Sequence, residues 1–183
     1  MSFFSKLFSR NGNDNENLSL LLRNDSFKKF ISQTKDISIG YSGINFIQLD
    51  DIENAQIGYS VSENGKSLIG NKNGDWKGNW IVIASDNLGD PIFVDSEDSN
   101  LSVYTSQHGQ GEWEETKIAS SLINFSEILN DLHKLSVGRE SPEEIEQNPI
   151  TENDLENFIK RIENKNSDVE IWFWEGFLEN DDE

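Results

Sequence analysis

One short stretch of the chain holds side chains that could perform acid–base chemistry. His108 comes just before the turn Gly109–Gly111, and two glutamates, Glu112 and Glu114, follow that turn. A histidine changes charge near neutral pH, and paired carboxylates can serve as acid and base in a hydrolase. The chain carries 34 Asp and Glu among 183 residues, however, so neighbouring carboxylates arise by chance. We therefore expect a structural histidine, no catalytic residue and no enzyme, with a hydrolase built on these side chains as the alternative.

Patterns for metals and cofactors are incomplete in this sequence. Gly109 and Gly111 lack the third glycine and the lysine of a phosphate-binding loop. The segment Asp95–Asn100 offers oxygen ligands for Ca²⁺ but lacks the spacing and the terminal Glu of an EF-hand. With no cysteine, the chain has no disulfide, no thiolate metal site and no cysteine nucleophile. We predict neither a metal nor a cofactor.

The net charge of −19 limits the classes of partner. Nucleic acids and anionic membrane surfaces should be repelled, because both are bound through Lys and Arg. A basic protein should be attracted and steered toward the surface. The alternative is that the acidity only keeps a cytosolic protein in solution. No run approaches the roughly 20 apolar residues of a membrane span, and Ser5 and Lys6 interrupt the apolar start, so we predict a cytoplasmic protein without a signal peptide.

The central strands should position the acidic turns. The run Trp80–Ala84 is almost wholly apolar, as in a strand buried on both faces. After a short turn, Pro91 can stand only at the start or edge of the next strand, Ile92–Val94. Further strands are predicted at 101–106 and 112–116. The short connections favour antiparallel pairing.

Helices are predicted before and after these strands. They are a helix capped by Asp25, a short helix at Leu49–Gly58, a helix from Ser120 or Ser121 to about Leu135, one opened by a capping box at Thr151, and one at Val169–Leu178. In the last helix, the spacing places Trp172 on the apolar face and Trp174 off it. A short strand at 67–69 and an acidic linker at 138–148 complete the prediction. No repeat or break divides the chain, so we expect one α+β domain over residues 1–183, with an N-terminal extension (1–24) and an acidic tail (179–183).

A partner is expected to contact the acids in the turns and on one strand face. The predicted set is Asp75, Trp76, Asp86, Asp90, Asp95, Glu112 and Glu114. Asp86, Asn87, Asp90 and Asp95 could cluster at one end of the hairpin, although turn chemistry explains these residues better. Trp80 should be in the core. Trp76 either packs inside as well or is partly exposed and anchors a partner, as aromatic residues do at interfaces.

The order of these motifs resembles the SUKH superfamily, the Smi/Knr-type domain. The resemblance covers about residues 47–132 and is carried by Ile57–Ser60, Trp80–Ala84, Gly89–Pro91, Phe93–Asp95, Val103–Trp113 and Ala119–Leu129. It implies a curved, largely antiparallel sheet with packed helices and no shared catalytic apparatus. Bacterial members are mostly immunity proteins that neutralise toxins, many of them nucleases, whereas fungal relatives are scaffolds in cell-wall signalling. The resemblance thus implies an immunity protein with a cognate, basic toxin as partner, or alternatively an acidic scaffold without one.

Overall fold

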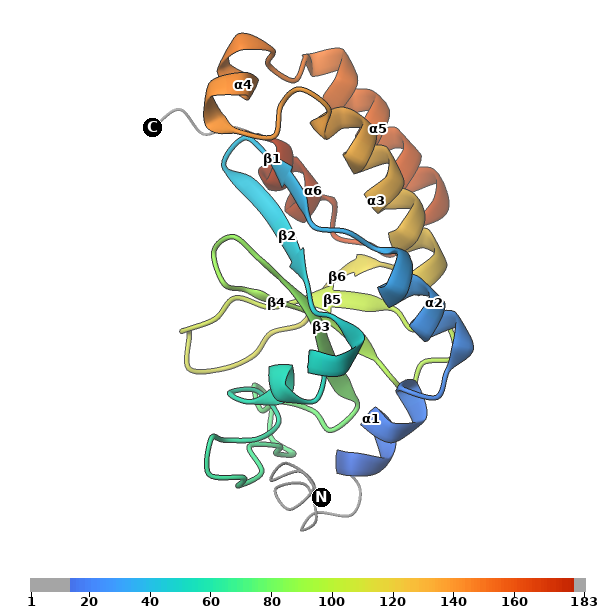
Figure 1. Ribbon diagram of the computed structural model, residues 1–183, viewed down its shortest axis with the longest axis vertical. Coiled ribbons are helices and arrows are strands. Elements are labelled where there is room, and N and C mark those ends of the chain that lie inside the picture. The colour runs from blue at the N-terminus through green and yellow to red at the C-terminus, as the bar shows by residue number, and fades with distance from the viewer. Residues whose placement is uncertain (1–13, 180–183) are drawn as a thin grey trace.

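The computed structural model describes residues 14–179. Within them, six strands form one curled antiparallel sheet in which strands adjacent in sequence pair (Figure 1). The strands are β1 (Ile37–Ile39), β2 (Ser42–Phe46), β3 (Trp80–Asp86), β4 (Pro91–Asp95), β5 (Val103–Thr105) and β6 (Thr116–Ala119). This confirms the predicted α+β fold with an antiparallel sheet. Residues 1–13 of the predicted extension and 180–183 of the predicted tail lie outside the described residues.

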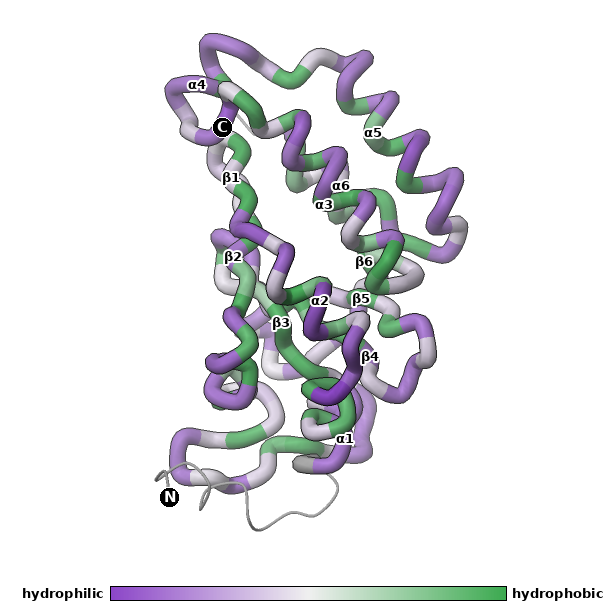
Figure 2. Tube along the Cα trace, turned by 45° about the vertical axis from the view of Figure 1, so that its right-hand side comes forward, coloured by the Kyte–Doolittle hydropathy of each residue, from purple (hydrophilic) through white to green (hydrophobic). Residues whose placement is uncertain are grey.

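The central strand β3 sends its side chains into two separate cores. Ile81 and Ile83 belong to the larger core, whereas Trp80 and Val82 belong to a smaller, aromatic core. Successive side chains of a strand point to opposite faces of the sheet, so the two cores lie on its two sides. Burial on both faces explains why β3 is a nearly continuous apolar run (Figure 2).

Helices cover the face of the sheet that carries the larger core (Figure 1). They are α1 (Asp14–Leu21), α2 (Asp25–Gln33), α3 (Leu122–Ser136), α4 (Pro142–Gln147), α5 (Glu152–Lys165) and α6 (Ile171–Leu178). Polar and apolar residues alternate along α5 (Figure 2), and its buried Phe158 and Ile162 face the core. The short helix α6 contacts both α5 and the sheet, so it stands between the helical layer and the strands.

Residues 47–79 cross the other face of the sheet. Two short 3₁₀ turns, η2 (Leu49–Asp51) and η3 (Asn54–Gln56), replace the predicted short helix, and isolated bridges replace the strand predicted at 67–69. The buried Gln56 ties this segment to β3. Its amide donates to the carbonyl of Val82 at 3.0 Å and accepts from the Val82 N–H at 3.0 Å. The covering segment is thus fixed to the central strand by hydrogen bonds as well as by packing.

An aromatic cluster fills the space under this covering segment. It consists of Tyr59, Trp76, Trp80, Phe93 and Trp113, and the ring centroids of Trp76 lie 5.0–5.3 Å from those of the other four. Trp113 comes from an irregular stretch, so the strand predicted at 112–116 is wrong and β6 begins only at Thr116. The N–H of Trp113 instead donates to the carbonyl of Gly74 at 2.8 Å. Trp113 is therefore turned inward, although it is not part of a strand.

Two other local predictions are corrected by the structure. Asn24, and not Asp25, caps α2, because the Asn24 side chain accepts from the N–H of Phe27. The predicted acidic linker at 138–148 contains α4, which opens with a full capping box between Ser141 and Glu144. The helix α3 begins after Ser121, one of the two predicted caps.

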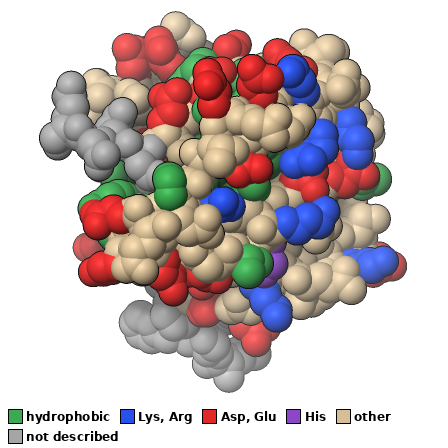
Figure 3. Space-filling model, turned by 90° about the horizontal axis from the view of Figure 1, so that it is seen from above, with side chains coloured by type: hydrophobic (Ala, Val, Ile, Leu, Met, Phe, Trp, Pro, Cys, Tyr) green, Lys and Arg blue, Asp and Glu red, His purple; other side chains and the backbone are tan. Residues whose placement is uncertain are grey.

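The acidic and basic side chains are unevenly distributed over the surface. Seen from above (Figure 3), acidic groups are spread widely, whereas basic groups gather mainly on the right of the view. Several of the basic side chains form ion pairs within or between α3 and α5; these pairs include Arg161 with Asp131 and Lys165 with Glu127. Much of the positive charge is therefore already paired with acids on the helical layer.

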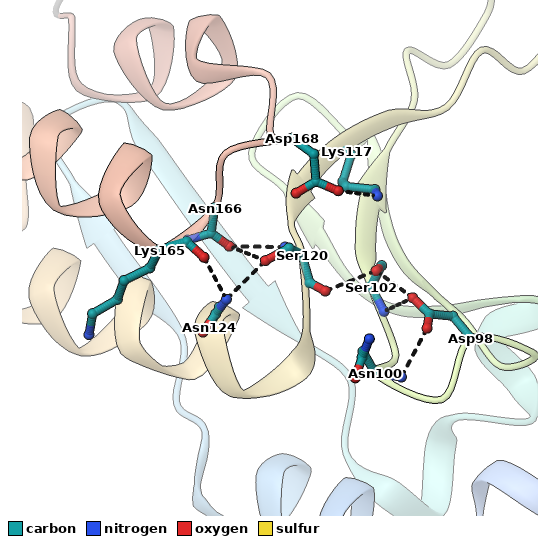
Figure 4. A network of polar contacts seen from close by, with 9 residues as sticks. All are labelled: Asp98, Asn100, Ser102, Lys117, Ser120, Asn124, Lys165, Asn166 and Asp168. Atoms are coloured by element: carbon teal, nitrogen blue, oxygen red, sulfur yellow. Dashed lines mark hydrogen bonds and ion pairs between the residues drawn. The ribbon is translucent and has the colours of Figure 1, made fainter.

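A network of polar side chains joins β5 and β6 to the helices (Figure 4). Ser102 Oγ lies within hydrogen-bonding distance of the Asp98 carboxylate and of the Ser120 carbonyl. The buried Asn166, at the end of α5, accepts from the N–H of Ser120 at 3.0 Å and from its Oγ at 2.9 Å. Asn124 in α3 donates to Ser120 Oγ at 2.9 Å. Each of these polar groups has a partner, as buried groups require.

The carboxylate of Asp98 is stabilised by this network. Burial alone would raise the pKa of Asp98, but the hydrogen bonds from the Ser102 hydroxyl and from the N–H groups of Asn100 and Ser102 outweigh it, and the pKa is lowered. The charged form of Asp98 is therefore the form that the folded state favours.

Candidate functional site

A groove opens at the end of the sheet opposite this network. The β1–β2 turn, the tip of the β3–β4 hairpin and the end of β5 form one side, and α6 forms the other. Its main hollow has a volume of about 390 Å³. A second hollow of about 310 Å³ adjoins it and shares Ser106, Gln107, Thr116 and Trp172 with it. We call the two hollows together the groove. Each is within the range of roughly 300–1,000 Å³ typical of ligand sites.

The hairpin tip holds two carboxylates at the edge of the groove. Asp86 ends β3, and its Oδ1 accepts from the N–H groups of Leu88 at 2.9 Å and Asp90 at 2.8 Å. Gly89 completes the turn with a φ of 90°, a left-handed conformation that glycine adopts without strain. Burial raises the pKa of the Asp86 carboxyl, and the neighbouring Asp90 carboxylate raises it further, against opposing backbone hydrogen bonds. A cation placed here would relieve that repulsion.

His108 connects the glycine-rich turn to the hairpin tip. Its N–H donates to Asp90 Oδ1 at 2.7 Å, and its ring Nδ1 lies 2.6 Å from the same oxygen. A histidine oriented by a carboxylate is the arrangement of a general base. The nearby hydroxyl of Ser106, however, has no hydrogen-bond partner, so His108 does not activate it as a nucleophile. The geometry thus gives His108 a structural role in holding two loops together.

Ser106 is the unusual polar residue of the groove. It follows the last residue of β5 and lines both hollows, yet only 2% of its surface is exposed. Within residues 14–179, its Oγ is the one buried side-chain polar atom without a hydrogen-bond partner. The preceding Thr105, by contrast, donates from Oγ1 to the Pro91 carbonyl at 3.0 Å. Buried hydroxyls nearly always have partners, so Ser106 requires an explanation.

Three large apolar side chains are exposed on the rim of the groove. Tyr41, Leu88 and Trp172 have 61%, 79% and 52% of their surface exposed. Tyr41 lies in the β1–β2 turn and Leu88 at the hairpin tip, and Trp172 comes from α6. Exposed apolar groups gathered in one place indicate an interaction site, whereas scattered ones need no explanation.

The faces predicted for the two tryptophans of α6 are wrong. Trp174 is fully buried and donates from Nε1 to the carbonyl of Ile118 at 2.9 Å, and Trp172 faces the groove. The helix is only eight residues long and contacts both α5 and the sheet, so a single apolar face does not describe it. Leu88 is an apolar residue at the tip of a hairpin, where polar residues are usual. That departure was the sequence signal that could have located the groove.

The structure brings together four of the seven residues predicted to bind a partner. Asp86 and Asp90 line the main hollow, and Glu112 and Glu114 line the adjoining one. Glu179 of the predicted tail also lines the main hollow. Among the described residues that line the groove, these five acids occur without any Lys or Arg. The groove is therefore negatively charged as well as apolar at its rim.

The other three predicted residues lie elsewhere. Asp95 pairs with Trp80 at the opposite end of the hairpin from Asp86, so Asp86, Asp90 and Asp95 do not form one cluster. Asp75 stabilises its own turn, where Oδ2 accepts from the N–H of Lys72 at 2.8 Å. Trp76 is 1% exposed at the centre of the aromatic cluster, so it packs inside and cannot serve as an exposed anchor.

Two further features of the described residues bear on the class of site. No group of three or more His, Asp or Glu side chains among residues 14–179 is arranged to hold a metal ion. The acids of Asp95–Asn100 instead accept hydrogen bonds from Asn79 and from backbone N–H groups of their own loop. In the same part of the chain, no helix is both long and apolar enough to span a membrane.

The fold is of the α+β class, with the groove at one end of its sheet. The chain belongs to the SMI1/KNR4 family (SUKH-1), whose family model matches residues 19–131. The match begins earlier than the expected residue 47 and therefore includes β1, β2, the whole of α2 and the end of α1. Helix α6, which forms one wall of the groove, lies after the matched residues. Comparisons with curated proteins and with solved structures gave no match.

Proposed function

We propose that this protein is an immunity protein of the SUKH-1 family. It binds a toxin domain of a bacterial polymorphic or contact-dependent toxin system, such as a nuclease, and blocks it without catalysis. The observation that supports this function best is the groove, where the described lining residues include five carboxylates and no Lys or Arg, beside exposed apolar side chains. Such a surface suits a basic protein partner in the cytoplasm, where the toxin would act.

The charge of the groove suggests how inhibition works. A nuclease must present Lys and Arg side chains to the phosphates of its substrate. An acidic protein that binds to those side chains competes directly with the nucleic acid. The exposed Tyr41, Leu88 and Trp172 would add apolar contact area, which charged groups alone do not supply.

Co-expression with the toxin encoded by the neighbouring gene tests the proposal. We expect this protein to restore growth of cells that produce the toxin and to form a complex that survives purification. Absence of both rescue and complex with any adjacent toxin would count decisively against an immunity function.

The alternative is an acidic regulatory or scaffold protein of the Smi/Knr type without a toxin partner. The sequence feature that favours it is the acidic, partly disorder-prone linker predicted at 138–148, together with the acidic tail. That segment contains the capped helix α4, and Arg139 donates to the carbonyls of Leu135 and Asn148 at 2.9 and 2.8 Å. The predicted linker is therefore a folded part of the domain.

Catalysis is tested separately. We expect no turnover of nucleotides, glycosides or esters, because the hydrogen bonds of His108 hold loops together. Activity that a His108→Ala substitution abolishes would support the hydrolase alternative instead.

A further inference from the structure

We infer that the groove is the surface that binds the toxin, and that it receives a projecting loop carrying a Lys or Arg side chain next to an apolar one. The inference rests on the proposed function and adds the site and the chemistry of the bound segment. Three features of the groove support it independently. They are the division of polarity between its two hollows, its exposed apolar rim, and the unpartnered hydroxyl between the hollows.

The two hollows differ in the side chains that line them. The main hollow has apolar walls formed by Leu88, Phe173 and Phe177, and the carboxylates of Asp86, Asp90 and Glu179 also line it. The smaller hollow is lined by Gln107, Gln110 and the two glutamates Glu112 and Glu114, together with the shared residues. An apolar side chain fits the first, and a cationic side chain fits the second. Two adjacent hollows of this kind match two neighbouring side chains of one loop.

The carboxylates of the groove are available to an incoming cation. Among residues 14–179, no Lys or Arg lines either hollow, so none of these residues neutralises the charges of Glu112 and Glu114 from within the groove. This contrasts with the helical layer, where Lys165 pairs with Glu127 and Arg161 pairs with Asp131. Charge complementarity therefore favours a basic segment over an acidic or a neutral one.

The apolar rim favours a protein partner. Of the seven large apolar side chains that are exposed among the described residues, three border this groove. Tyr and Trp are enriched among the residues that dominate binding energy, because their rings bury large areas with little loss of side-chain freedom. Tyr41 and Trp172 lie on opposite sides of the groove, one in a strand turn and the other in α6.

Ser106 supplies the point at which a bound loop would be held. The residue lines both hollows, and its hydroxyl is buried in the free protein without a partner, so a bound loop could reach the hydroxyl only after the hydroxyl turns toward the groove. A buried polar group without a hydrogen bond is destabilising, and a ligand that supplies the bond removes that cost. A carbonyl or N–H group of the bound loop would satisfy Ser106 while its two side chains occupy the hollows.

Gly176 allows a test that blocks the groove without harming the fold. It lies within α6 and lines the main hollow, and a Cβ placed on it would meet no atom within 4 Å. Gly176→Leu should fill the hollow, and leucine also has a higher helix propensity than glycine. The control is Asn157→Leu, which adds the same side chain at an exposed position of α5 outside the groove. The probe is the toxin domain encoded by the neighbouring gene, inactivated by a substitution in its own active site.

We expect Gly176→Leu to weaken binding of this probe by about tenfold or more, with a thermal midpoint equal to or above that of the wild type. Asn157→Leu should leave the affinity unchanged. Titration calorimetry measures the affinities. Unchanged affinity for Gly176→Leu would overturn the inference while leaving the immunity function in place, because the toxin would then bind elsewhere.

A second pair of variants tests the hydroxyl. Ser106→Ala should weaken binding about 3–10-fold without lowering the thermal midpoint, because it removes a group that has no partner in the free protein. Ser102→Ala should lower the thermal midpoint and leave the affinity unchanged, since Ser102 is hydrogen-bonded within the polar network and lies outside the groove. Equal affinities for Ser106→Ala and the wild type would contradict the proposed hydrogen bond.

The remaining outcomes are also informative. If the wild-type protein does not bind the toxin at all, the proposed function fails and the inference fails with it. If sedimentation shows a dimer that Gly176→Leu dissociates, a second copy of this chain occupies the groove and the inference is overturned. Binding that is lost with Gly176→Leu and retained with Asn157→Leu supports the inference.

Discussion

Two buried serines flank the strand β5, and they differ in their hydrogen bonds. Ser102, just before the strand, is 3% exposed and is bonded to Asp98 and Ser120. Ser106, just after it, is 2% exposed and has no partner. At the Ser102 end, polar groups join the sheet to the helices (Figure 4), whereas at the Ser106 end the sheet opens into the groove. The difference indicates that polar contacts support the fold at one end of the sheet, whereas at the other end, where we propose that the toxin binds, a buried hydroxyl is left without a partner.

The largest expected difference in stability is between the loss of an interior tryptophan and the loss of one in the groove. Trp76→Ala should lower the free energy of unfolding by about 3–5 kcal/mol, because it leaves a cavity among the rings of Trp80 and Phe93. Trp172→Ala, at a position 52% exposed, should change it by less than about 0.5 kcal/mol. Unfolding in denaturant measures both. A similar loss for the two variants would mean that the groove wall is part of the core.

The polar network should show the next largest effect. Asn166 is 2% exposed and accepts two hydrogen bonds from Ser120, so Asn166→Ala should cost roughly 1–3 kcal/mol of stability. The control at the groove end is Asn87→Ala, which removes two exposed hydrogen bonds, one donated to the Tyr41 carbonyl and one accepted from the Asn45 amide, and should cost much less. If Asn87→Ala were the more destabilising variant, the contrast between the two ends would be contradicted.

One carboxyl at each end of the sheet should change the stability of the fold with pH, and the two changes should have opposite signs. The pKa of Asp98 is lowered in the folded state, so Asp98 stabilises the fold above its unfolded pKa, and this stabilisation is lost as pH falls through the folded value. The pKa of Asp86 is raised by burial and by Asp90, so ionisation of Asp86 reduces stability as pH rises above the ordinary value of 3.8.

Substitution by asparagine separates the two carboxyls. Relative to the wild type, Asp98→Asn should lose stability near neutral pH, and Asp86→Asn should equal or exceed the wild type there. Both differences should shrink as the pH falls, because the wild-type carboxyls become protonated. Denaturant unfolding at a series of pH values measures the differences. A stability loss in both variants at neutral pH would mean that Asp86 also supports the fold when charged.

The local sequence was sufficient to predict the central hairpin. The apolar run Trp80–Ala84 and the position of Pro91 located β3 and β4, because both signals depend on the local chain. The capping box at Thr151 located the start of α5 for the same reason. Burial of single aromatic residues could not be predicted in this way. Trp76 is covered by Tyr59 and Trp113, which are distant in sequence, and no local pattern records that contact.

The groove was predicted only in part, for a related reason. Its acids stood out as charges in turns, so Asp86, Asp90, Glu112 and Glu114 were found. Its apolar half forms because α6 faces the hairpin tip across the end of the sheet. These two segments are about 80 residues apart in the sequence, so no local pattern indicates that they meet. Ser106 has no sequence signal at all, because the absence of a hydrogen-bond partner is a property of the folded surroundings.

The smallest expected effect concerns the rate of association with the toxin. If the groove acids steer a basic partner, the triple substitution Asp86→Asn, Glu112→Gln and Glu114→Gln should slow association more than it speeds dissociation. The matched control, Asp50→Asn, Asp51→Asn and Glu53→Gln, removes the same charge from exposed positions in and next to η2, outside the groove. Because surface fields are screened over about 8–10 Å at physiological ionic strength, charges beside the binding site should matter more than equal charges elsewhere. Stopped-flow measurements over a range of salt concentrations give both rates. Equal slowing by the two triple variants would show that the net charge of the whole surface, and not the groove, steers the partner.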